Sequence, residues 1–122
     1  MSDSIMRDRS KFLARRVVLL CRQLRAQGVE TVLISQLLRS GTSVGANLHE
    51  AQYAQSGKDF VSKLEIALKE CNETDYWLEL LQDTSSVPEQ EAQQMRAICT
   101  DLRRMLVSAI KTMKQKQTNS ND

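Results

Sequence analysis

The sequence contains few of the residues that build turns and many-stranded sheets. Its 122 residues include four glycines, one proline and 4% aromatic residues. An all-β domain needs turn signals every ~8–12 residues, so this composition excludes a β-sandwich or barrel and favours an all-helical fold. The longest unbroken apolar run, residues 17–21, is far shorter than the ~20 residues that cross a bilayer. The sequence therefore predicts no membrane span.

The sequence also lacks the common motifs of catalysis and metal binding. Its three cysteines, Cys21, Cys71 and Cys99, form no C-x-x-C pair, which argues against a disulfide framework or a local zinc site. The only histidine, His49, has no H-E-x-x-H, G-x-S-x-G or phosphate-loop motif around it. Arg39 lies ten residues before His49, too far for the closely spaced Arg and His of small helical ribonucleases. We expect a non-enzyme with no catalytic residues, metal or cofactor.

What the sequence does contain is typical of one globular domain. Hydrophobic residues make up 41% and charged residues 26% of the chain, near the average for folded proteins. Acidic residues and arginines stand among the first nine residues, where a signal peptide needs an apolar stretch. We therefore expect a cytoplasmic protein with no membrane partner.

Four segments carry the i, i+3/i+4, i+7 apolar spacing of amphipathic helices. The first segment stops before Gly28, and the second runs from about residue 31 to 54. Ser56 and Ser86 each open a capping-box pattern that predicts the start of the third and fourth helices. Because the loops are short, we expect an all-α, antiparallel up-down-up-down four-helix bundle in one domain, residues 1–117. Residues 118–122 are polar and are expected to form a disordered tail.

Several large apolar residues fall outside the predicted core faces of the helices. They are either ordinary exposed hydrophobic residues or part of an interface between copies of the chain. The sequence favours an oligomer interface, with Trp77 as the best single anchor because it is large and rigid. The predicted interface residues are Phe12, Leu19, Ile66, Trp77 and Leu80.

Basic residues concentrate at the two ends of the chain. Segments 1–30, 31–83 and 84–122 carry charges of +4, −4 and +2, which sum to the net charge of +2. The basic residues of the first and last helices each fall within one arc, and these helices are neighbours in such a bundle, so the two stripes are expected to merge. The stripes are either a solvated face or a phosphate-binding surface. The predicted nucleic-acid contacts are Lys11, Arg15, Arg22, Arg25, Arg96, Arg103, Arg104, Lys111 and Lys114.

Two glycines interrupt the second predicted helix, at Gly41 and Gly45. Glycine inside a helix costs up to ~1 kcal/mol relative to alanine. Because both glycines lie on the core-facing arc, they predict a close approach of another helix. Arg39 lies on the opposite arc, where solvent or a neighbouring copy is expected.

This region carries a resemblance to a known family. Residues 37–51, LLRSGTSVGANLHEA, followed by residues 58–70, KDFVSKLEIALKE, and residues 73–81, ETDYWLELL, closely resemble the bacterial four helix bundle protein family, also called the 23S rRNA intervening sequence protein family. The resemblance covers the second and third helices continuously. His49 departs from the acidic or small residue that many members have there.

The resemblance implies an up-down bundle that assembles as a ring, a homopentamer, with no catalytic residues. It also points to the accessory variability proteins of diversity-generating retroelements, which bind nucleic acid and associate with a reverse transcriptase. Within the family motif, the residues expected to serve the fold or assembly are Arg39, Ser40, Gly41, Gly45, Asn47 and Glu50.

Two hypotheses of different classes follow. The first is a non-enzymatic homo-oligomer that binds RNA or DNA, with structured RNA favoured, through its basic stripes. The alternative is a protein-interaction scaffold in which the acidic third helix, or the apolar residues outside the core faces, dock a partner protein with a basic surface, such as a reverse transcriptase.

Overall fold

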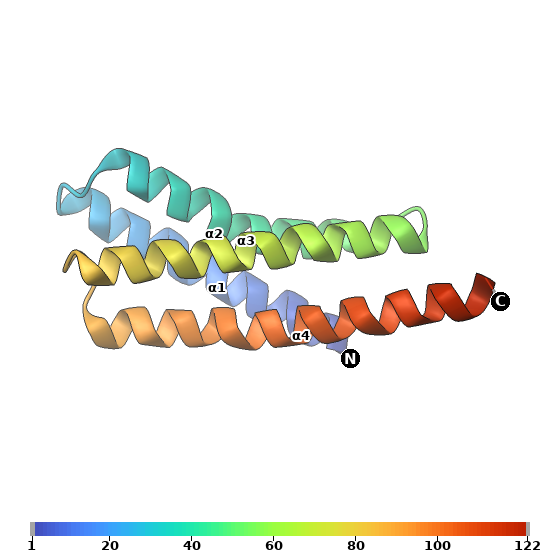
Figure 1. The fold of residues 1–122 in the computed structure, drawn as a ribbon. Coiled ribbons are helices and arrows are strands. Elements are labelled where there is room, and N and C mark those ends of the chain that lie inside the picture. The colour runs from blue at the N-terminus through green and yellow to red at the C-terminus, as the bar shows by residue number, and fades with distance from the viewer. Residues whose placement is uncertain (1, 122) are drawn as a thin grey trace.

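Four helices form an antiparallel bundle, as the computed structural model shows for residues 2–121 (Figure 1). They are α1 (Ser2–Ala26), α2 (Thr31–Ala51), α3 (Gly57–Asp83) and α4 (Glu89–Asn121), with no strand in this range. Each helix packs against the helix before and after it, and α1 and α4 close the bundle through the sparsest of the four contacts. The prediction of an all-α four-helix bundle is confirmed.

The helix ends show which sequence signals act as predicted. Gly28 has a φ of 77° after α1, and the side chain of Ser56 accepts a hydrogen bond from the Asp59 amide at 3.1 Å. The prediction that Ser86 caps the last helix is wrong, because α4 begins at Glu89 and the Pro88 carbonyl accepts the Ala92 amide at 3.0 Å. The positive φ of Ser85, 62°, draws the chain into a tight turn before this point. The second helix ends at Ala51, three residues before its predicted end.

The core runs along the bundle axis and draws apolar side chains from all four helices. Helices α1 and α2 approach closely at Gly41, where an added Cβ would stand 2.7 Å from Val17 Cγ2. The predicted close approach is thus confirmed at Gly41. At Gly45 an added Cβ would make an ordinary contact, 3.4 Å from Ser10 Oγ.

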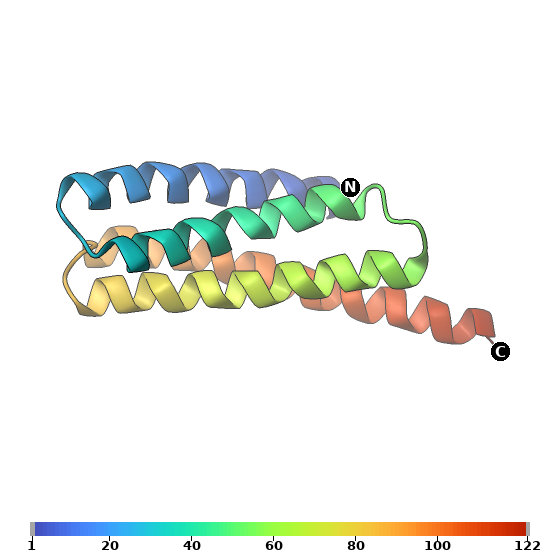
Figure 2. The same cartoon turned by 90° about the horizontal axis from the view of Figure 1, so that it is seen from above.

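Helix α4 projects past the other three helices at its C-terminal end (Figures 1 and 2). It continues to Asn121, although the sequence predicted a helix that ends after Gln117. The segment contains no glycine or proline to stop it, and Thr118 Oγ1 donates to the Lys114 carbonyl at 3.0 Å. Residue 122 lies outside the described residues. Among residues 2–121, no helix is long and apolar enough to span a membrane.

Candidate nucleic-acid interface

The basic residues predicted on the first helix lie on the surface of α1. The side chains of Lys11, Arg15, Arg22 and Arg25 are exposed. None of them forms an ion pair with an acidic side chain of residues 4–119, the range over which side chains are described. Lys11 borders a groove between α1 and α2. This stripe therefore faces solvent on the α2 side of α1.

The basic residues of α4 divide into two groups. Arg96 donates to both carboxylate oxygens of Asp75, at 2.8 and 3.2 Å, and the bond with Asp75 raises the pKa of its guanidinium. Lys114 Nζ donates to Glu65 Oε2 at 3.1 Å. Both of these cations are turned toward α3 and compensated there. The α4 cations that are exposed and have no ion pair in the described part of the chain are Arg103, Arg104 and Lys111.

The expectation that the two basic stripes merge across the α1–α4 seam stays a prediction. The seam is bridged by Arg9 and Asp101, whose Nη1 and Oδ2 atoms lie 3.5 Å apart. The paired cations of α4 point toward α3. The unpaired Arg104 of α4, in contrast, lines the same cavity as Ile5 of α1.

The predicted interface residues also divide between exposed and packed. Phe12, Leu19 and Ile66 are 45%, 55% and 41% exposed. Trp77 packs partly against the core with its Nε1 atom buried, and Leu80 is half-buried. Trp77 is thus partly covered within its own chain, and its role as an interface anchor stays a prediction.

Ile5 is an exposed apolar residue of α1 that the sequence-based prediction did not include. Ile5 is 46% exposed on α1 and stands seven residues before Phe12, which itself stands seven residues before Leu19. A spacing of seven places all three side chains on one face of the helix. That spacing was the available signal, and it extends the α1 apolar stripe (Ile5, Phe12, Leu19) toward the N-terminus.

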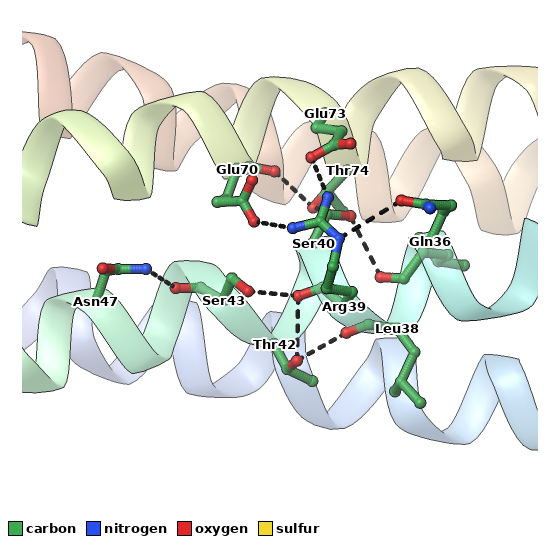
Figure 3. Close-up of polar contacts among 11 residues, drawn as sticks. Gln36, Leu38, Arg39, Ser40, Thr42, Ser43, Asn47, Glu70, Glu73 and Thr74 are labelled. Carbon is green, nitrogen blue, oxygen red and sulfur yellow. Dashed lines mark hydrogen bonds and ion pairs between the residues drawn. The ribbon is translucent and has the colours of Figure 1, made fainter.

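Arg39 joins α2 to α3 (Figure 3). Its Nη1 atom donates to Glu70 Oε2 at 2.6 Å, and its Nη2 atom donates to Glu73. The hydrogen bond from Arg39 lowers the pKa of Glu73. Arg39 is exposed, as expected from its place opposite the core-facing arc of α2. Its side chain also clamps two helices of the same bundle.

The neighbouring motif residues also make contacts inside the bundle (Figure 3). Ser40 is buried, and its Oγ atom lies 3.0 Å from the Thr74 hydroxyl of α3. Asn47 Nδ2 donates to the Ser43 carbonyl at 2.8 Å within α2, and Glu50 is exposed. The assignment of the motif to the fold is thus supported for Arg39, Ser40 and Gly41.

The side chains that most often carry catalysis are dispersed or buried. His49 is exposed, with its ring centroid 5.6 Å from that of Tyr53. Cys21, Cys71 and Cys99 are buried free thiols, and the hydrogen bond with Cys71, together with burial, raises the pKa of Cys99. Within the described residues, no cluster of three or more His, Cys, Asp or Glu side chains is placed to hold a metal ion.

Comparison with known proteins places this bundle among relatives. The sequence model of the family described as 23S rRNA-intervening sequence protein matches residues 2–108. A crystal structure of a protein of unknown function from the S23 ribosomal protein family of Bacteroides thetaiotaomicron is 45% identical, with a TM-score of 0.88. That similarity covers 91% of this chain and 99% of the other. No curated protein matches the chain.

Proposed function

Because the chain belongs to the 23S rRNA-intervening sequence protein family, we propose that it is a non-enzymatic accessory protein that assembles with itself and binds nucleic acid. Structured RNA is the preferred ligand in this proposal. The observation that carries the proposal is the set of exposed, unpaired cations on α1 and α4. A protein that neutralises phosphates with such side chains releases counterions, which supplies much of the free energy of binding.

The pairing of charges supports RNA over a basic protein as the partner. The acidic residues of α3 are largely compensated within the bundle: Glu70 and Glu73 by Arg39, Asp75 by Arg96, and Glu65 by Lys114. A basic partner docking on α3 would have to compete with these internal cations. The unpaired cations, in contrast, offer their full charge to a polyanion. We therefore prefer nucleic-acid binding to a scaffold that docks a reverse transcriptase.

Self-assembly would repeat these cations around a ring. The α1 apolar stripe lies on α1, whereas exposed Ile66 lies on α3, and α1 and α3 are not neighbours in the bundle. Contact between two unlike patches is head-to-tail, and such contacts form a ring when the rotation between successive subunits closes. A homopentamer of this kind would present the basic residues several times over, and multivalency raises the affinity for a long polyanion.

The test of RNA binding is a salt titration with matched variants. A fluorescein-labelled RNA hairpin is titrated with the protein, and the slope of log K against log salt is measured by fluorescence anisotropy. Lys111→Gln removes an unpaired cation and should lower the slope by ~0.9 for a contact to a duplex. Lys114→Gln removes a cation already paired with Glu65 and serves as the control. Equal slopes for both variants, or no binding at low salt, would contradict the proposal.

The test of assembly compares two exposed apolar positions. Phe12→Glu alters the α1 apolar stripe, and Val32→Glu alters a residue that is 71% exposed in the first turn of α2, away from that stripe. Light scattering coupled to size exclusion should give a multiple of 13.9 kDa for the parent and for Val32→Glu. Phe12→Glu should give a smaller mass with unchanged helical circular dichroism. A monomeric parent at micromolar concentration would refute the assembly.

A further inference from the structure

A groove of about 410 Å³ runs between the N-terminal half of α1 and the C-terminal half of α2. Its volume lies near the lower end of the ~300–1,000 Å³ that small-ligand sites occupy. Its walls carry Arg7 and Lys11 from α1 and His49 from α2. Asp8 is the one acidic side chain among its described lining residues. The groove is thus concave and rich in groups that can bear positive charge.

The floor of the groove is built from small residues, and Gly45 is the informative one. An alanine Cβ at Gly45 would make only an ordinary contact, 3.4 Å from Ser10 Oγ. The same atom at Gly41 would stand 2.7 Å from Val17. Helix packing therefore requires glycine at Gly41 but not at Gly45, although a helical glycine costs up to ~1 kcal/mol relative to alanine. Gly45 lines the groove, so a large side chain at this position would reduce its depth.

The cations in the groove are free to meet a ligand. Arg7 Nη2 donates a hydrogen bond to Ser4 Oγ at 3.3 Å, which leaves its charge without an acidic partner among the described side chains. Lys11 has no acidic partner within residues 4–119. A guanidinium fork beside an ammonium group is the chemistry that binds a phosphate oxygen pair. His49 stands on the opposite wall, where it can donate to the same anion.

The surroundings of the groove indicate a polymeric phosphate. Lys11, Arg15 and Arg22 continue along α1 at axial steps of ~6 and ~10 Å from the ~1.5 Å rise per residue. An isolated anion could occupy the groove but could not reach these cations as well. We propose that the α1–α2 groove holds a backbone phosphate of an RNA strand between Arg7, Lys11 and His49, and that the strand continues along α1. This inference rests on the proposed RNA binding and adds the site of one contact.

The test uses the same labelled RNA hairpin and charge changes at His49, which is exposed. His49→Lys should raise and His49→Glu should lower the affinity by about eightfold at ~0.1 M salt, the effect of one phosphate contact. Gln94→Lys and Gln94→Glu, on an exposed residue of α4 outside the groove, control for net charge. Gly45→Leu should weaken binding with no change of charge, because its side chain fills the groove.

The outcomes separate the groove from the general proposal. If Gly45→Leu loses its helical circular dichroism, Ala46→Leu at the exposed rim replaces it. The groove assignment is tested only in a protein that binds the RNA and is weakened by Lys111→Gln. In that case the assignment is overturned if the His49 variants bind the RNA like the Gln94 controls and the groove-filling variant binds it like the parent. A parent that binds no RNA at low salt overturns the proposed function and the groove with it.

Discussion

Replacement of Gly41 by alanine should destabilise the bundle, although alanine is the better helix former. The added Cβ would stand 2.7 and 2.8 Å from the two Cγ atoms of Val17 on α1. Valine has one strongly preferred rotamer in a helix, so its side chain cannot rotate away at low cost. The two helices must therefore move apart, and the buried contacts on either side of Gly41 loosen.

The magnitude follows from two opposing terms. Alanine in place of a helical glycine contributes up to ~1 kcal/mol of stability. Insertion of a methyl group into a close-packed contact costs ~1–3 kcal/mol. We expect a net loss of about 1 kcal/mol for Gly41→Ala. Gly45→Ala is the matched control, because its Cβ makes an ordinary contact, and it should gain about 0.5 kcal/mol.

The assay is urea unfolding followed by circular dichroism at 222 nm, at one fixed protein concentration because assembly contributes to stability. A third variant, Gly41→Ala with Val17→Ala, removes the clashing Cγ atoms. The loss of stability in the double variant should be smaller, by ~1 kcal/mol or more, than the sum of the losses in the two single variants. The reasoning is refuted if Gly41→Ala is as stable as Gly45→Ala, or if the double variant is additive.

Three further results are expected. Trp77→Ala should cost ~1–3 kcal/mol in urea unfolding, because the ring packs partly against the core; an unchanged midpoint would contradict this packing. Arg39 lowers the pKa of Glu73, so the ionised carboxylate stabilises the fold above the unfolded pKa of ~4.3. This stability is lost as the pH falls through the lower folded pKa, so Glu73→Gln should make the free energy of unfolding fall less steeply between about pH 5 and 3. An identical pH dependence for the two proteins would exclude the effect. Burial raises the pKa of the Cys21 thiol, and the hydrogen bond with Cys71 together with burial raises that of Cys99. A thiol reagent should therefore react slowly with the native chain and fast with the chain unfolded in urea. Fast reaction of these thiols in the native protein would show that the bundle opens.

The fold was predictable because its signals are local. Apolar spacing marks four helices, Gly28 ends the first helix and Ser56 caps the third, and each signal acts within one or two turns of the chain. Ser86 shows where local reasoning fails. Its sequence pattern is that of a cap, which predicts a helix from Val87. The turn at Ser85 places the helix start at Glu89, two residues later, and only the path of the whole loop decides this.

The candidate site was harder to predict because it depends on rotation of the helices about their axes. Trp77 lies off the heptad seam of α3 by spacing, yet its side chain is partly buried and packs against the core. Arg39 lies opposite the apolar arc of α2, yet its long side chain reaches two carboxylates on α3. Periodicity predicts which residues share a face, but not how far a flexible side chain reaches from that face.

Lys111 and Lys114 show why the pairing of charges, rather than their number, is the informative property. They stand three residues apart on one helix, ~5–6 Å between Cβ atoms, which is within the ~8 Å Debye length at physiological salt. Loss of either residue therefore changes the net charge felt by a nearby polyanion by the same amount. Lys114 is bound to Glu65 and Lys111 has no acidic partner in the described chain. Any difference between their variants in the salt slope must then come from direct phosphate contact, which net charge alone cannot produce.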